Sequence, residues 1–280
     1  MGNCIMARKI NYISRIKDTF DIVISGVNGV FMRGNQADNE TIDALIKMYQ
    51  SGKRVALASN SGMRVQDMYY ALKKKDVPMN IFCAMITAGE IAHYYLKSHP
   101  QIGHTYYNLA GGPSAVANGL NFRQADSVVM ADFIVAETSG EGVDESGLLT
   151  VLEQALHLRL PMLCVGNNTS VVTENGVFPS IGACAERYAM MGGEIIPFGK
   201  PDVRIAAYLT ENMPQFDKKR CLVIGDCMTT DMRMGNAFGA QNLLLTDGVH
   251  QLNGDVERQI NDLSGSYGLN VDYYTEKLQW

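Results

Sequence analysis

The sequence contains no apolar run long enough to span a membrane and no segment with the apolar core of a signal peptide. Both absences argue against a membrane protein or a secreted one, and we expect a cytoplasmic protein. The first seventeen residues contain no acidic side chain, whereas they include Arg8, Lys9, Arg15 and Lys17. Such a composition is compatible with a transit peptide, but a solvated or partly helical leader is the favoured interpretation.

Paired cysteines and basic blocks are also missing. The six cysteines are scattered without a C-x-x-C pair, which argues against a metal site and for reduced thiols in the core. They are Cys4, Cys83, Cys164, Cys184, Cys221 and Cys227. The net charge is −5 and no run of basic residues stands out, so a nucleic-acid-binding surface is not expected. The length of 280 residues allows one large domain or two modest ones.

What the sequence does contain is an alternation of strand and helix patterns in its first third. The strand patterns lie at residues 21–25, 54–60 and 83–87, and the helix patterns begin at residues 39, 65 and 88. The first helix pattern places apolar side chains on one face, and Gly52 is suited to end it. Continuously apolar strands joined by helices predict an α/β fold with a parallel sheet and right-handed crossovers.

The middle of the chain differs in composition and pattern from both the first and the last third. Glycines are dense there, and two apolar strand patterns at 132–137 and 161–166 enclose a helix pattern. The last third returns to buried strands, at 220–226 and from 241 onward. We therefore expect a Rossmann-like core made of residues 1–98 and 195–280, with an α/β module inserted at 99–194.

Four loops follow the carboxyl ends of the predicted core strands, where ligands bind in open α/β sheets. They lie at residues 26–29, 59–62, 198–201 and 226–231. Ser59 offers a hydroxyl and Lys200 a cation, which suit an anion. Asp226 is placed to hold a divalent metal, and Asp231 to support it. Each residue alone can equally be a helix cap, a turn residue or a solvated charge, so the prediction depends on their order.

That order resembles class IIA of the haloacid dehalogenase superfamily, the group similar to p-nitrophenyl phosphatases. Nearly the whole chain takes part: the first motif corresponds to GVNGVFMRG, the second to LASNSG, the third to GKP and the fourth to GDCMTTDMRMGNAFGA. The fourth pattern, G-D-x-x-x-T-D-x-x-x-G, is specific, and GKP at its correct distance strengthens it. The resemblance implies a Rossmann-like haloacid dehalogenase core with an inserted α/β cap domain.

The chain departs from the family in the first motif, which is D-x-D-G in relatives. There the first Asp attacks the phosphoryl group, and the second acts as general acid and base. This chain has Gly26 and Asn28 at these positions. Glycine has no atom that can attack phosphorus, and an amide cannot exchange a proton near neutral pH. Loss of a nucleophile lowers turnover by about a millionfold in a preorganised site.

The resemblance implies that other parts of the site persist. The implied phosphate-binding residues are Ser59, Asn60 and Lys200, and the implied metal ligands are Asp226, Asp231 and the backbone carbonyl of Asn28. The metal would be Mg²⁺. Its binding should be weakened, because one of the anionic ligands found in relatives is missing.

The four loops offer no obvious substitute nucleophile. Ser25 adjoins Gly26, but alternation along a strand points it to the opposite face. Ser59 and Ser61 lie nearer, yet no histidine in these loops could serve as their base. The histidines are His93, His99, His104, His157 and His250. Asp21 precedes the strand, so a shift in register would not restore a carboxylate.

Three functions remain open. The first is a pseudophosphatase that binds a small phosphorylated metabolite or a protein partner without efficient hydrolysis. The second is an active Mg²⁺-dependent phosphatase with an unorthodox nucleophile, or with a water held by Asp226. The third is a non-catalytic scaffold that interacts through its cap.

In relatives the cap chooses the substrate and often forms a homodimer interface. The corresponding cap loop of this chain contains Gly166, Asn167 and Asn168, and it lacks the usual carboxylate. The identity of the substrate therefore cannot be carried over, and the loop can equally be a simple turn. Dimerisation through the cap is what the resemblance implies, whereas neither a membrane nor a nucleic acid is expected as a partner.

Overall fold

The computed structural model describes residues 7–137, 148–173, 175–213 and 217–280, which form two compact units. The first unit consists of the chain up to Ala58, Tyr69–Met85 and Val203–Trp280, and the second of Ser59–Met68 and Ile86–Asp202. Each unit is built on a parallel sheet of its own.

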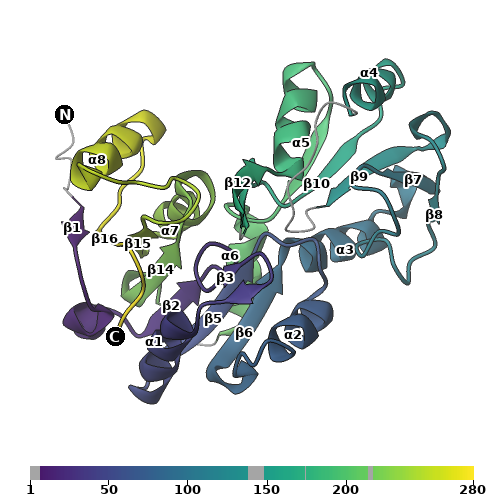
Figure 1. Cartoon of the computed structure of the whole chain (residues 1–280). Helices are drawn as coiled ribbons and strands as arrows, with labels where there is room; N and C mark the ends of the chain where they lie inside the picture. Colours follow the sequence, from purple (N-terminus) through teal and green to yellow (C-terminus); the bar gives the residue numbers. More distant parts are fainter. Residues whose placement is uncertain (1–6, 138–147, 174, 214–216) are drawn as a thin grey trace. The chain divides into compact units, whose positions relative to one another are not determined.

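A seven-stranded sheet forms the centre of the first unit (Figure 1). Its strands, in spatial order, are β1 (Arg8–Lys9), β16 (Tyr273–Thr275), β15 (Gln241–Leu245), β14 (Cys221–Gly225), β2 (Ile22–Ser25), β5 (Arg54–Ser59) and β6 (Phe82–Thr87). β14 pairs with β2 in parallel, with Leu222 opposite Val23. Strands from the two ends of the chain therefore share one sheet. The predicted α/β fold with a parallel core sheet is confirmed.

Helices connect these strands, as their apolar faces predict. α1 (Asn39–Gln50) begins after Asp38, whose carboxylate accepts the backbone N–H groups of Glu40 and Thr41 and so caps the helix. Gly52, which the sequence suggested as its terminator, has a φ of 86°. The further elements are η1 (Ile13–Thr19), β3 (Met32–Arg33), β4 (Gln36–Ala37), α2 (Val65–Lys73), η2 (Met79–Ile81), α6 (Val203–Asn212), η5 (Lys218–Arg220), η6 (Met228–Met232), α7 (Arg233–Phe238) and α8 (Val256–Tyr267).

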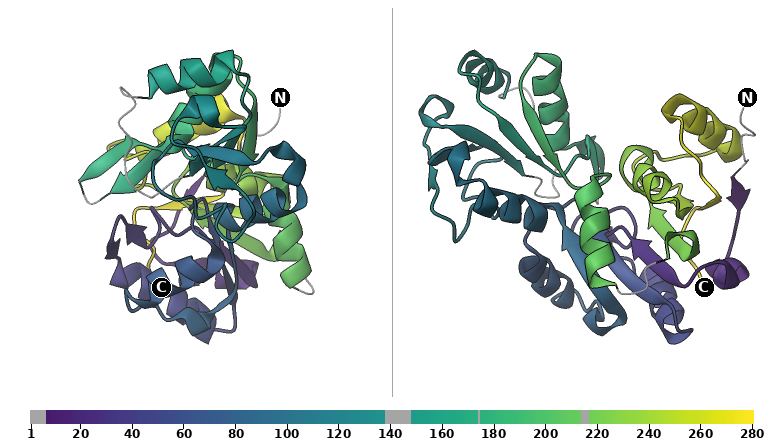
Figure 2. Two further views of the ribbon diagram at one scale, coloured as in Figure 1. Left: turned by 90° about the vertical axis from the view of Figure 1, so that its right-hand side faces the viewer. Right: turned by 180° about the vertical axis from the view of Figure 1, so that it is seen from behind.

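The loop after β14 packs against α8, which lies beside β15 and β16 (Figures 1 and 2). Ile260 of α8 is fully buried and packs with Leu244 and Tyr274 of the two strands. Met228, the first residue of η6, belongs to the same cluster and is also fully buried. Burying such a side chain contributes about 1.5–3 kcal/mol. This packing fixes the turn that carries Asp231.

The N-terminal leader packs onto the first unit. The 3-10 helix η1 buries Ile13 and Ile16, each only 1% exposed, and β1 pairs with β16. The partly helical interpretation is therefore confirmed for Ile13–Thr19, where two apolar side chains reach the core while the charged side chains of the leader stay exposed. Residues 1–6 of the leader, with Cys4, lie outside the described residues.

A five-stranded parallel sheet forms the second unit, with helices on both of its faces (Figure 1). Its strands, in spatial order, are β13 (Ile195–Phe198), β10 (Met162–Val165), β9 (Phe133–Glu137), β7 (Thr105–Asn108) and β8 (Arg123–Gln124). The other elements are α3 (Ala88–Ser98), η3 (Pro100–Ile102), η4 (Val128–Met130), α4 (Leu149–His157), the hairpin β11 (Ser170–Thr173) and β12 (Gly176–Pro179), and α5 (Ile181–Met190). Over the described ranges of the chain, no helix is both long and apolar enough to cross a membrane.

Tyr188 of α5 anchors the core of the second unit. Its ring is fully buried, and its hydroxyl donates to the carbonyl of Leu160 at 2.8 Å, so the polar end of the side chain is satisfied. Leu152 of α4 and Met162 of β10 belong to the same apolar cluster. On α3, Tyr95 packs edge-on against Phe198 of β13, with 5.1 Å between ring centroids.

The units divide at other residues than the predicted boundaries of core and cap. Residues 59–68 and α3 belong to the second unit, since Arg64 pairs with Glu90 of α3 and the N–H of Gly89 donates to the carbonyl of Ser61. The assignment of 99–194 as a cap stays a prediction.

The cysteines outside residues 1–6 are all free thiols, as expected from their spacing. Cys164, Cys184, Cys221 and Cys227 are buried, but Cys83 is exposed. Cys83 lies near the start of β6, which is an edge strand of the seven-stranded sheet, and its side chain is exposed there. The expectation of a core thiol is wrong at this position.

Candidate functional site

The predicted site residues fall into two groups, one in each unit. The carboxylate site comprises Gly26, Asn28, Asp226 and Asp231 of the first unit, and the anion site comprises Ser59, Asn60 and Lys200 of the second. All of them lie at or after the carboxyl ends of parallel strands, as predicted: β2 and β14 for the carboxylate site, β5 and β13 for the anion site. The structure brings members of each group together within their own unit.

Asp226, directly after β14, is 3% exposed and is enclosed by glycine backbone. A Cβ atom on Gly29 would lie 2.0 Å from Asp226 Oδ2, and one on Gly248 would lie 2.2 Å from Asp226 Cβ. Gly29 also has a φ of 78°, a conformation that glycine adopts without steric cost. The N–H of Val249 donates to Asp226 Oδ2 at 3.0 Å. The carboxylate is thus held in one place by two close backbones and a hydrogen bond.

Asp231 is enclosed in a similar way. It is 2% exposed and lies in η6, a single π-helical turn. A Cβ atom on Gly225 would lie 2.1 Å from both Cβ and Cγ of Asp231. On the other side, Asp231 Oδ1 lies 3.5 Å from the position that a Cβ atom of Gly26 would take. Asp231 is therefore the carboxylate that faces Gly26, the position at which the family resemblance predicts a lost nucleophile.

The space beside Gly26 is bounded by an apolar group as well as by Asp231. Its nearest neighbour is Val30, whose Cγ2 would lie 3.0 Å from an added Cβ atom. The backbone of Gly26 continues the sheet register, because its N–H donates to the carbonyl of Ile224 at 2.9 Å. An added side chain at this position would therefore start from an ordinary strand end, with Val30 yielding by a few tenths of an ångström.

The side chains adjacent to Gly26 and Asp226 are poor nucleophiles. The hydroxyl of Ser25 is buried and donates to the carbonyl of Gly26 at 2.8 Å. Burial, followed by the charges of Asp226 and Asp231, raises the pKa of the Cys227 thiol, which disfavours the reactive thiolate.

Asn28 presents its side chain to solvent, in a tight turn. The turn is made by backbone groups: the carbonyl of Val27 accepts the N–H groups of Val30 and Phe31, and the N–H of Gly29 donates to the carbonyl of Met32 at 2.8 Å. The fold of this loop therefore does not depend on the side chain of residue 28.

The structure adds His250 to the carboxylate site, which sequence reasoning had missed. The N–H of Met228, two residues after Asp226, donates to His250 Nε2 at 3.0 Å. Burial lowers the pKa of His250 below its ordinary value of 6.5, so the ring is kept neutral and can accept this bond. A sequence signal existed, because His250 follows the carboxyl end of β15, where ligand-binding loops gather.

We expect the stability of the protein to fall as the pH drops below about 6.5, with a contribution from His250. The folded-state pKa of His250 is lowered, so the unfolded chain binds the proton first, and the stability that is present at higher pH is lost on acidification. Urea unfolding of the parent and of His250→Gln between pH 7.5 and 5 measures the contribution of His250 to this pH dependence. Glutamine can still accept the Met228 N–H but does not titrate, so the variant should lose less stability; identical pH profiles would contradict this role.

Ser59 ends β5 and begins the anion site. Its hydroxyl accepts the N–H of Ser61 at 3.2 Å, and the hydroxyl of Ser61 accepts the N–H of Met63 at 3.2 Å. Both serines are buried. Two successive side-chain turns of this kind wind the chain tightly directly after the strand.

Arg64 and Glu90 fasten this loop to α3. The guanidinium of Arg64 donates from Nε and Nη2 to the two carboxylate oxygens of Glu90, at 2.8 and 2.9 Å, and the N–H of Val65 donates to the same carboxylate. Burial acts to raise the pKa of Glu90, but the hydrogen bonds from Arg64 and Val65 outweigh it and the pKa is lowered. A bidentate, charge-assisted pair of this kind holds its partners in one orientation.

Asn60 serves as a connector within the second unit. Its Oδ1 accepts the N–H of Lys200 at 2.6 Å, and its Nδ2 donates to Asn168 Oδ1 at 2.6 Å. Asn167 Nδ2 donates to the carbonyl of Lys200 at 3.3 Å. The loop of Asn167 and Asn168, which could have been an unrelated turn, is thus joined to two residues of the anion site. Lys200 itself is 5% exposed.

Few side chains of the described residues are available to bind a metal ion. Among the residues that the structure describes, no three His, Cys, Asp or Glu side chains form a group that could hold a metal ion. Asp226 and Asp231 supply two buried carboxylates. Mg²⁺ commonly uses one or two carboxylates and completes its shell with water and phosphate oxygens. These donors fit a weak Mg²⁺ site better than a cage made of protein alone.

Two family models match this chain, and both describe haloacid dehalogenase hydrolases. The model described as haloacid dehalogenase-like hydrolase matches residues 23–123, and a second, HAD-hydrolase-like, matches residues 197–262. The first match includes Gly26, Asn28, Ser59 and Asn60, and the second includes Lys200, Asp226, Asp231 and His250.

Known proteins are similar over almost the full length. Glycerol-3-phosphate phosphatase of Gallus gallus is 26% identical, covering 92% of this chain and 89% of its own. A haloacid dehalogenase-like hydrolase from Brucella suis 1330 has a similar structure, with a TM-score of 0.79 and 21% identity. The match covers 96% of this chain and 99% of the hydrolase. The p-nitrophenyl phosphatase of Archaeoglobus fulgidus is also similar in structure, with a TM-score of 0.64 and 18% identity. That match covers 92% of this chain and 96% of the phosphatase.

Proposed function

Because the chain belongs to the haloacid dehalogenase superfamily, whose relatives here are phosphatases, we propose that it binds a phosphorylated ligand without hydrolysing it efficiently. The observation that carries this proposal is the composition of the carboxylate site. Glycine stands at position 26, beside Asp231 and the methyl group of Val30, and an exposed asparagine stands at position 28. Neither residue can attack phosphorus or exchange a proton near neutral pH.

An active phosphatase with a substitute nucleophile has less support. Ser25 has its hydroxyl committed to the carbonyl of Gly26, and the Cys227 thiol has a raised pKa. His250 lies near the loop but uses Nε2 to accept the N–H of Met228, so it is not placed to activate a serine as a base. Attack by water would still lack the covalent intermediate through which relatives divide the reaction into two easier steps.

Binding has support in the anion site. Ser59 and Ser61 wind a tight loop after β5 that presents their hydroxyls, and the Arg64–Glu90 pair holds that loop against α3. Lys200 provides a cation and is fastened to Asn60 through its backbone. We propose that Ser59, Asn60 and Lys200 hold a phosphate, with Asn60 acting mainly by positioning Lys200.

The residues that would hold Mg²⁺ are Asp226, Asp231 and the backbone carbonyl of Asn28. A bound Mg²⁺ supplies positive charge to phosphoryl oxygens. Asp226 and Asp231 would contribute their carboxylates from buried, glycine-lined positions. With the third carboxylate of relatives absent, we expect millimolar rather than micromolar affinity.

The ligand we propose is a small phosphorylated metabolite. The name of the similar glycerol-3-phosphate phosphatase points to this class of compound. The loop of Asn167 and Asn168 touches the anion site through amide groups, which favours recognition by hydrogen bonds over recognition by charge. A homodimer through the second unit and a cytoplasmic location stay predictions.

The proposal is tested by thermal unfolding with orthovanadate and Mg²⁺, combined with a hydrolysis assay on a panel of phosphate monoesters. At a vanadate concentration of about 100 times Kd, binding stabilises by about 2.7 kcal/mol, which raises the Tm by several degrees. Lys200→Met should remove most of this shift, whereas Lys218→Met, which removes an exposed cation of the first unit, should retain it.

Two results would overturn the proposal. Turnover at ordinary enzyme rates by the parent protein would establish a working phosphatase with another nucleophile. Absence of any vanadate-dependent or phosphate-dependent shift at millimolar concentrations would favour the scaffold.

A further inference from the structure

The strand β1 forms one edge of the seven-stranded sheet and pairs only with β16 in the described structure. The N–H of Arg8 donates to the carbonyl of Asp272 at 2.9 Å, and the N–H of Ile10 donates to that of Tyr274 at 3.0 Å. In a ladder, alternate residues of an edge strand direct their N–H and carbonyl groups to opposite sides. The N–H and carbonyl of Lys9 therefore face away from the sheet, where a further strand could add.

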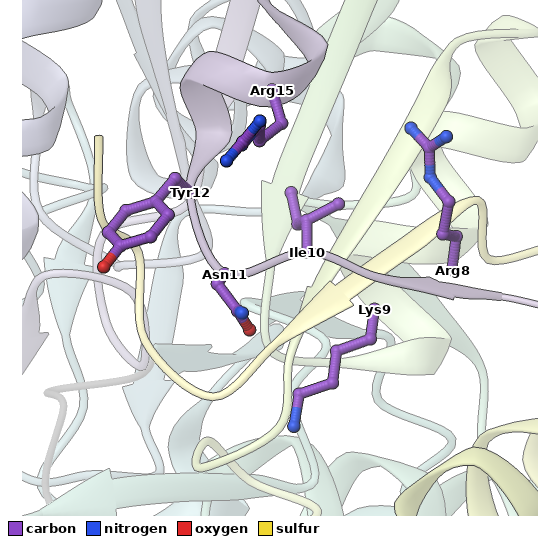
Figure 3. A pocket seen from close by; sticks show the side chains of 6 residues that line it. All are labelled: Arg8, Lys9, Ile10, Asn11, Tyr12 and Arg15. Carbon is purple, nitrogen blue, oxygen red and sulfur yellow. The ribbon is translucent and has the colours of Figure 1, made fainter.

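Basic side chains line one hollow at this edge, while a second hollow that Lys9 also borders is lined by both Glu276 and Lys277. A hollow of about 340 Å³ is lined by Arg8, Lys9, Ile10, Asn11, Tyr12 and Arg15, shown in Figure 3. Its three cations are exposed, and within the described residues no acidic side chain forms an ion pair with any of them. Arg8 instead lies over the ring of Tyr273, with 5.1 Å from Cζ to the centroid. This basic edge contrasts with the whole chain, whose net charge is −5.

The three charged groups do not converge on one point. In Figure 3 the guanidinium groups of Arg8 and Arg15 lie well apart on one side of the strand, and the ammonium of Lys9 points to the other side. A small anion such as phosphate could contact only one of these groups at a time. An extended polyanion that runs along the strand could reach all three.

We infer that the β1 edge docks an extended acidic segment of a partner protein. The segment adds to the sheet as a further strand, through the outward N–H and carbonyl of Lys9, and its carboxylates meet Arg8, Lys9 and Arg15. The main-chain hydrogen bonds of the added strand contribute the affinity. The side chains that alternate along it determine the specificity. Charge complementarity selects the partner, because the same basic side chains repel a second copy of this edge.

Charge reversal tests the electrostatic part of this inference. The probe is a fluorescein-labelled peptide of alternating Glu and Thr, with a Lys and Thr peptide as its counterpart, and binding to the full chain is followed by fluorescence anisotropy. We expect the acidic peptide to bind preferentially and to weaken with salt. Lys9→Glu with Arg15→Glu should weaken it by at least about tenfold, whereas the matched reversal Lys218→Glu with Lys219→Glu, elsewhere on the first unit, should change it less than about twofold.

A backbone substitution tests the strand addition. Lys9→Pro removes the outward N–H while it leaves the N–H groups of Arg8 and Ile10 in place, and Lys9→Val removes the charge alone. Lys9→Pro should bind the acidic peptide about fivefold more weakly than Lys9→Val, the equivalent of one hydrogen bond. Circular dichroism and Tm establish that each variant is folded.

The inference is overturned if the two peptides bind equally, if reversal of Lys9 and Arg15 has no more effect than the control, or if Lys9→Pro and Lys9→Val are equivalent. Inorganic phosphate, phosphatidylserine vesicles and single-stranded DNA serve as competitors. Displacement of the peptide by any of them at lower concentration than by unlabelled peptide would also reject a protein partner. None of these outcomes depends on the anion site, so this inference and the proposed function can be rejected independently of each other.

Discussion

Replacing Gly26 and Asn28 together by aspartate is expected to create Mg²⁺-dependent hydrolysis of phosphate monoesters, at least about 100-fold above the parent protein. The reason is that both missing groups return at once. The new carboxylate at position 26 would supply the nucleophile and a third acidic group beside Asp231, and the one at position 28 would supply the acid and base. An added Cβ at position 26 meets Val30 Cγ2 at 3.0 Å, so the neighbouring methyl group must yield slightly.

The matched control is Gly26→Asn with Asn28→Asp, which has the same shape at position 26 but no nucleophilic carboxylate. Activity that requires Mg²⁺ and appears only in the double aspartate variant, together with a phosphoenzyme that mass spectrometry locates at position 26, would bear out the expectation. Val30→Ala can be added to give room. A folded double variant that stays inert with and without Val30→Ala would mean that more than the first motif has been lost.

Gly29→Ala is expected to destabilise the protein for two reasons, the backbone conformation of this residue and its close approach to Asp226. The glycine has a φ of 78°, and an added Cβ would lie 2.0 Å from Asp226 Oδ2. Left-handed backbone costs an alanine about 1–2 kcal/mol, and overpacking costs about 1–3 kcal/mol more. We expect a combined loss of about 2–5 kcal/mol, with weaker Mg²⁺ binding because Asp226 must move.

Gly52→Ala separates these two contributions. Gly52 has a φ of 86° but no heavy atom within 4 Å of its added Cβ, so it carries only the backbone cost. The difference between the two variants in urea unfolding measures the contact with Asp226. Equal losses of stability, or unchanged Mg²⁺ binding in Gly29→Ala, would show that Asp226 does not depend on this glycine.

The fold could be predicted from the sequence because its signals are local and repeated. The continuously apolar strands β2, β5 and β14, each ended by small or polar residues, indicate a buried parallel sheet. The loops after them point to the site by the general rule for α/β sheets. The leader was harder to interpret, since Ile10, Ile13 and Ile16 lie in a basic segment, and their burial depends on the part of the same chain against which the leader packs.

The sequence predicts candidate site residues, which stay a prediction, but it does not predict the hydrogen bonds that connect them. The position of Asn60 in the second motif predicts a phosphate ligand. In the structure, its side chain instead forms hydrogen bonds with Lys200 and Asn168. His250 lies 22 residues from Met228 along the chain, so no spacing rule links them. Contacts between distant loops are set by how the strands are ordered, and that order is a property of the whole sheet.

The glycines around the two carboxylates differ in what they permit. At Gly29, Gly225 and Gly248 an added Cβ would lie within 2.0–2.2 Å of Asp226 or Asp231, whereas at Gly26 the closest atom is 3.0 Å away. At three of these positions an added side chain would require Asp226 or Asp231 to move, whereas at Gly26 only the methyl group of Val30 must yield. A library randomised at all four should return folded clones that vary almost only at position 26. The predicted loss of the nucleophile is therefore, in steric terms, a reversible change.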